Sequence, residues 1–122
     1  MFKVFFESGG VITYSTFGKN NYSIGVKEGA GGTTYGPFVF IRGKYINDTG
    51  LRKHELVHVR QGWNPRWWFK SRIEKERAAY KEQIKWYPER TYDENVSYFA
   101  KRIAESCNLG VTQKEAEILL RA

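Results

Sequence analysis

His54-Glu55-Leu56-Val57-His58 contains both histidines of this chain. On a helix, a spacing of four residues puts both imidazoles on one face, one turn apart, where they can bind the same metal ion. Residues 47–49 (Asn-Asp-Thr) supply cap residues before this helix, and Gly62 with the following Asn-Pro ends it. The sequence therefore predicts a capped helix with a paired metal ligand on one face.

The part of the chain before residue 50 has the pattern of a small sheet. It is rich in Gly, Thr, Tyr, Phe and Val, and the turn-like triplet Ser8-Gly9-Gly10 separates its first two apolar runs. The glycine-rich residues 29–32 predict a loop. The strand-like runs are residues 2–6, 11–17, 22–26 and 38–41. We expect a mostly antiparallel sheet.

The pattern after residue 50 is helical. Three capping boxes predict helix starts at Ser71, Thr91 and Thr112, each with a glutamate three residues later. Pro88 closes the first of these helices, the second spans about residues 92–107, and a short one follows Thr112. The chain is expected to be one α+β domain, residues 1–122. Its β-rich part (1–50) packs against the motif helix, and two to three further helices complete the helical part (51–122).

Composition and charge limit the class of protein. Among 122 residues, 41% are hydrophobic and 16% aromatic, which argues against disorder. The single Cys107 rules out an intramolecular disulfide. No signal peptide and no membrane-spanning run are visible, which favours a cytoplasmic protein. Residues 51–90 carry eleven Lys or Arg against five Glu, nearly all of the net charge of +7. Solvated helix faces explain this excess, and an anionic partner is the alternative.

A catalytic zinc usually has three protein ligands and one position for water, so a third ligand is needed. No third histidine exists, and the candidates on the next long helix are Glu74 and Glu76. At about 100° per residue, Glu76 lies roughly 50° from the centre of that helix's apolar stripe and Glu74 roughly 110° from it. Glu74 is also the capping partner of Ser71. Glu76 is the predicted ligand.

Residues 54–61 (HELVHVRQ), the aromatic run 67–69, Arg72 and residues 76–80 (ERAAY) together resemble gluzincin-type zinc metallopeptidases. In particular, the chain is similar to short single-domain proteins of this kind found in bacteria and phages. This similarity implies a phage-associated location as an alternative to the cytoplasm. It implies one zinc per chain, bound by His54, His58 and Glu76. It further implies a peptide or protein substrate. The chain differs from larger gluzincins in having Tyr80 where they have an aspartate.

The implied chemistry is hydrolysis of a peptide bond by a water that the zinc activates, with Glu55 as the general base. An oxyanion stabiliser is also needed, and Tyr80, Tyr35 and Arg77 are the candidates. Residues 38–41 are expected to be either a sheet edge beside the cleft, which would pair with an extended peptide, or a plain core strand.

The aromatic residues between the two ligand-bearing helices predict a packed corner that brings Glu76 back to the histidines. An alternative is that they stack on nucleobases or touch a membrane surface. This aromatic set is Trp63, Trp67, Trp68 and Phe69.

Two further functions stay open. One is a catalytically silent binding or structural protein with a zincin fold, for instance in a phage particle or beside a toxin. The other is a basic nucleic-acid-binding protein. The sequence does not indicate an oligomeric state.

Overall fold

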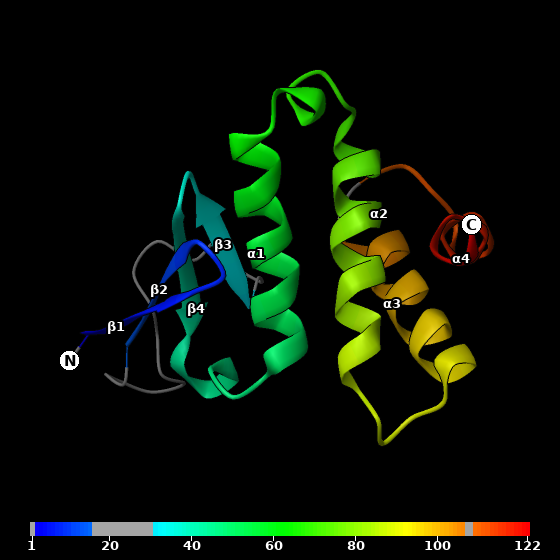
Figure 1. The fold of residues 1–122 in the computed structure, drawn as a ribbon. Helices are drawn as coiled ribbons and strands as arrows, with labels where there is room; N and C mark the ends of the chain where they lie inside the picture. The colour runs from blue at the N-terminus through cyan, green and yellow to red at the C-terminus, as the bar shows by residue number, and fades with distance from the viewer. Residues whose placement is uncertain (1, 16–30, 107–108) are drawn as a thin grey trace.

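The structure is a computed structural model, and it describes residues 2–15, 31–106 and 109–122. A sheet lies on one side, α1 covers it, α2 runs beside α1, and α3 and α4 lie beyond α2 (Figure 1). The expected α+β class is confirmed. The predicted strand at 22–26 and Cys107 lie outside the described residues. The elements are β1 (Phe2–Glu7), β2 (Gly10–Ser15), β3 (Gly32–Tyr35), β4 (Phe38–Arg42), α1 (Thr49–Trp63), α2 (Arg72–Gln83), α3 (Tyr92–Ser106) and α4 (Gln113–Arg121), with short 3-10 turns at Gly43–Tyr45, Pro65–Trp67 and Ile84–Trp86.

The sheet is mixed, in the order β1-β2-β4-β3. β1 with β2 and β3 with β4 pair antiparallel, whereas β2 and β4 pair parallel. The predicted hairpin joins β1 to β2 through Ser8 and Gly9, both at positive φ (47° and 84°), as a two-residue hairpin turn of type I′ requires. β4 has a neighbour on each side, so the core-strand interpretation of residues 38–41 holds and the edge interpretation is wrong. Among the described residues β3 is an end strand of the sheet, and its first residue, Gly32, was expected to lie in a loop.

Two separate hydrophobic clusters flank the interface between α1 and α2. The first joins one face of α1 to the sheet through Ile12, Val39, Ile41, Leu56 and Val59. The second joins α2 to α3 and α4 through Tyr80, Ile84, Val96, Phe99, Ala100, Ile103, Ala116 and Leu120. The remaining face of α1 therefore meets α2 at a contact that neither cluster fills.

Side-chain caps fix where the helices begin. Asp48 is the N-cap of α1 and accepts a hydrogen bond from the Leu51 amide at 3.0 Å. At Thr91 and Thr112 both hydrogen bonds of the capping box are present. At Ser71 the described contacts include only the bond that the Ser71 hydroxyl accepts from the Glu74 amide. These caps satisfy free N–H groups at the helix starts and set the rotational phase of the residues that follow.

Candidate metal centre

Two turns of α1 and one of α2 bring three potential metal ligands together. Nε2 of His54 lies 3.3 Å from one carboxylate oxygen of Glu76, and Nε2 of His58 lies 3.1 Å from the other. The donor atoms of all three side chains lie within 4.8 Å of one another, close enough to hold a metal ion. Spacing on α1 aligns the two rings, and α2 crosses opposite them to add the carboxylate.

The charges at this centre favour a carboxylate anion between two imidazoles. Burial alone raises the pKa of Glu76, but hydrogen bonds from His54 and His58 outweigh it and hold that pKa far below its usual range. Burial alone lowers the pKa of His58, but the hydrogen bond and charge of Glu76 outweigh it and raise that pKa. The site therefore keeps Glu76 as an ionised carboxylate, the charge state in which it can bind a cation.

Gln61 orients one of the two imidazoles. Nδ1–H of His58 donates to Oε1 of Gln61 at 2.9 Å, which leaves Nε2 of the ring to face Glu76. The amide group of Gln61, 4% exposed, also donates to the Lys75 carbonyl at 3.1 Å and so ties α1 to α2. Outer partners of this kind fix the ring orientation of a metal-binding histidine.

Glu55 points to the sheet rather than to α2. Its side chain is 6% exposed, and its Oε2 accepts a hydrogen bond from the Thr34 hydroxyl at 2.6 Å. A Cβ at Gly32 would lie 3.2 Å from Cγ of Glu55, so the glycine leaves room for this side chain against β3. The charge of Glu55 still reaches the metal centre, because it raises the pKa of His58. A buried carboxylate therefore borders the three potential ligands without belonging to them.

The three predicted oxyanion candidates have different surroundings in the structure. The ring of Tyr80 is 8% exposed and lies edge-on to His54 with 4.4 Å between centroids. Arg77 is engaged elsewhere, since its guanidinium donates to the carbonyls of Leu119 at 2.7 Å and Ala122 at 2.9 Å, at the end of α4. Tyr35, on β3, is 49% exposed. Of the three predicted oxyanion candidates, Tyr80 is the one with a described contact to a potential metal ligand.

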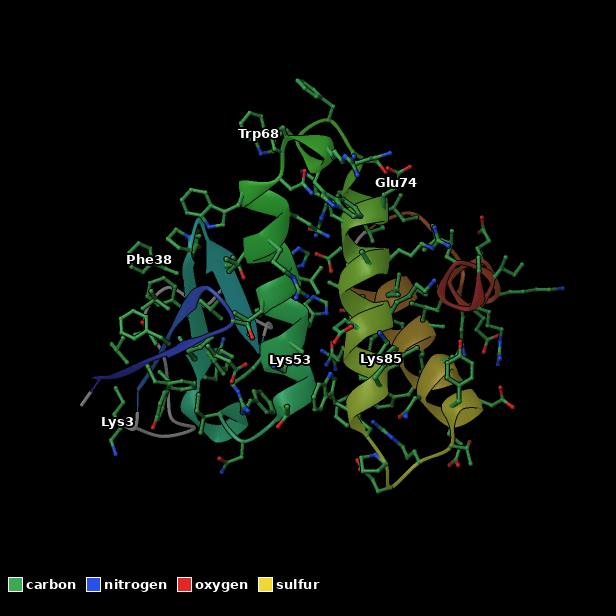
Figure 2. All side chains as sticks on the ribbon, in the orientation of Figure 1. Lys3, Phe38, Lys53, Trp68, Glu74 and Lys85 are labelled. Atoms are coloured by element: carbon green, nitrogen blue, oxygen red, sulfur yellow. The ribbon has the colours of Figure 1, made fainter. Side chains whose placement is uncertain are left out.

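The structure separates the two candidate glutamates on α2. Glu76 faces α1, whereas Glu74 is exposed and lies on the side of α2 away from α1 (Figure 2). Sequence reasoning missed the roles of Gln61 and Thr34. Gln61 had a readable signal, because it lies three residues after His58 on the same helix face. Thr34 had none, because it meets Glu55 only through the folding of β3 onto α1.

The predicted aromatic corner is wrong in its main feature. Trp63, Trp68 and Phe69 are 67%, 58% and 95% exposed, and only Trp67 is partly buried. The turn between α1 and α2 is instead held by polar contacts. Asn64 caps the 3-10 turn through the Arg66 amide at 3.0 Å. Glu76 is thus brought to the histidines by the α1–α2 pairing itself.

Comparison with known proteins gives no family assignment. No protein-family model, curated protein or solved structure matches the chain. The functional argument therefore depends on the residues of this site.

Proposed function

We propose that the chain is a gluzincin-like zinc hydrolase of peptide bonds, with His54, His58 and Glu76 as ligands and Glu55 as the general base. Two imidazoles and one carboxylate are the ligand set of several catalytic zinc sites, whereas structural sites are closed by four ligands. The observation that carries the proposal is the buried Glu55 beside the three potential ligands, because a purely structural ion has no use for it.

The donor atoms lie near the separations that a zinc ion needs. Ligand atoms at about 2.0–2.1 Å from a tetrahedral ion lie roughly 3.3 Å apart. The separations of 3.3 and 3.1 Å run from the two histidines to different carboxylate oxygens of Glu76, so zinc binding would turn one of these oxygens toward both rings. The side chains of His58 and Glu76 are each 19% exposed, so solvent reaches this side of the centre.

The residues divide the chemistry between them. Zinc bound there would supply Lewis acidity and lower the pKa of water to near neutrality. Glu55 takes up the proton of the attacking water and delivers it to the leaving amine. Thr34 holds the Glu55 carboxylate in place through its hydroxyl. Tyr80 remains the proposed oxyanion stabiliser.

An extended peptide has a place to bind. β3 carries Thr34 beside the proposed general base, and it is an end strand of the sheet in the described part of the chain. Addition of an extended peptide to an end strand is a recurring mode of peptide recognition. A peptide bound along β3 would lie next to Glu55, which supports a peptide as the substrate class.

Metal analysis and a cleavage assay test the proposal together. The wild-type protein is expected to hold one zinc and to cleave denatured casein or a proteome-derived peptide library. Glu55→Gln should keep the zinc and lose cleavage by at least about a hundredfold, the scale of general-base catalysis. Glu76→Gln should lose zinc, whereas the matched Glu74→Gln should keep both properties. Zinc lost in neither glutamate variant would remove the proposed ligand set.

A catalytically silent zincin-like protein is the second candidate, and the position of the site favours it. The three potential ligands lie at the interface between α1 and α2, between two separate hydrophobic clusters, where an ion would hold the two helices together. An ion that serves only this purpose predicts tight zinc and strong thermal stabilisation, with no cleavage by the wild type. Unchanged biological function in Glu55→Gln would then decide for this candidate.

A further inference from the structure

The turn between α1 and α2 presents apolar rings to solvent at one end of the molecule. We call the segment from Trp63 to Lys70 the aromatic turn; Trp68 marks it at the top of Figure 2. It holds three of the four tryptophans of the chain. Phe69 is the most exposed large apolar residue described, at 95%, and Trp63 and Trp68 are more than half exposed. Exposed apolar clusters of this kind mark binding surfaces, since water disfavours them.

Several polar groups of the aromatic turn are hydrogen-bonded within it or to the end of α1. Nε1–H of Trp68 donates to the Gly62 carbonyl at 3.0 Å, which fixes the ring and satisfies its only donor. Backbone amides of Trp67, Trp68 and Lys70 donate to carbonyls three residues back, at 2.9, 3.2 and 3.2 Å. Because these N–H groups are already hydrogen-bonded within the protein, the turn can leave water without burying them unpaired.

Positive charge surrounds these rings. Arg66, Lys70 and Arg72 are exposed, and no acidic residue occurs between Glu55 and Glu74. Tryptophan and phenylalanine at the level of lipid headgroups, with arginine and lysine around them, are the arrangement by which proteins attach to an anionic bilayer surface. In the described parts of the chain, no helix is both long and apolar enough to cross a bilayer.

We propose that the aromatic turn attaches the protein to the surface of an anionic membrane. Phe69 and the tryptophans enter the headgroup region, and the three cations bind the lipid phosphates. A nucleic acid fits the turn less well, because single strands are held along grooves with rings stacked against successive bases, whereas this turn protrudes from the end of two helices (Figure 1). At 1.5 Å per residue, His58 lies only about 8 Å along α1 from Trp63, so attachment would hold the metal centre close to the bilayer.

Vesicle sedimentation tests this proposal. The full chain is expected to sediment with phosphatidylcholine vesicles that contain phosphatidylserine, and much less with phosphatidylcholine alone. Phe69→Ser should weaken this binding severalfold, whereas Phe6→Ser, which removes a ring of similar exposure from β1, should not. Far-ultraviolet circular dichroism of each variant checks that it folds.

A charge-matched pair of double variants tests the cations. Arg66→Gln with Lys70→Gln should weaken binding to anionic vesicles by about fivefold for each lost charge near the surface. Lys101→Gln with Lys114→Gln makes the same change in net charge at exposed positions on α3 and α4, and should have little effect. Equal loss in both pairs, or equal binding to neutral vesicles, would overturn the proposal. Retention of a single-stranded oligonucleotide without any vesicle binding would overturn it in favour of a nucleic acid.

Discussion

Replacing Gln61 by leucine should weaken metal binding without touching a ligand. The change removes the acceptor for Nδ1–H of His58 and the donor to the Lys75 carbonyl, while a side chain of similar size stays in place. The freed imidazole can then rotate and no longer presents Nε2 to Glu76 in one fixed orientation. We expect the zinc dissociation constant to rise about 10- to 100-fold, the usual effect of losing such an outer partner.

The loss of zinc affinity and the loss of fold stability are of similar size, so they are measured in separate assays. A 10- to 100-fold weaker affinity corresponds to about 1.4 to 2.7 kcal/mol of binding free energy. Two lost hydrogen bonds, at about 1 kcal/mol each, should lower the unfolding free energy of the metal-free protein by about 2 kcal/mol. Titration against a chromophoric zinc chelator at constant neutral pH measures the first quantity, and urea unfolding without metal measures the second.

Gln83→Leu and Gln61→Glu are the matched controls. Gln83 is 5% exposed and donates to the Tyr87 hydroxyl at 2.9 Å, so its loss should destabilise the fold and leave zinc affinity unchanged. A carboxylate at position 61 can still accept from His58, so Gln61→Glu should keep zinc affinity while it loses the bond to Lys75. Zinc binding by Gln61→Leu within about twofold of wild type, or an equal loss in Gln83→Leu, would refute the role of this amide.

Two further predictions concern stability. Gly50→Ala should lower the unfolding free energy by about 1–3 kcal/mol, because its Cβ would lie 2.6 Å from the Tyr87 hydroxyl, which donates to Asp48. Gly62→Ala, with no atom within 4 Å of the new Cβ, should instead stabilise the helix slightly; urea unfolding compares the two. The backbone N–H of Thr112 lowers the pKa of Glu115, so the stability that this carboxylate supplies is present above the ordinary glutamate pKa and is lost as pH falls through the lowered value. Wild type and Glu115→Gln should therefore differ in melting temperature at neutral pH and converge in acid; a difference that is constant with pH would contradict this.

The parts of the fold that the sequence predicts well are set by local chemistry. Asp48, Thr91 and Thr112 cap helices where the sequence places them, because a cap depends on a side chain and the amides two or three residues later. The facing of Glu76 also follows from helical periodicity, which is fixed once the helix start is known. Such features need no knowledge of the rest of the molecule.

Features that depend on distant partners escaped prediction. β3 is four residues long and begins with glycine, and it becomes a strand only because β4 lies beside it. Its Thr34 meets Glu55 across 21 residues of sequence. The prediction of a packed aromatic corner was wrong for a different reason. Large apolar residues are usually buried, but a short turn at the end of two helices has too little interior for four rings.

The position of α1 explains why a short motif can organise the whole site. One face of the helix is fixed to the sheet by Leu56 and Val59, and the next face is tied to α2 by the hydrogen bond from Gln61 to the Lys75 carbonyl. Glu55 lies on the sheet side and the histidines on the α2 side, so neighbouring positions in sequence receive different surroundings about 100° apart around the helix. Thr34 can then hold the proposed base while Glu76 completes the proposed ligand set. A rotation of α1 by one residue would exchange these surroundings, and the packing of Leu56 and Val59 against the sheet opposes it.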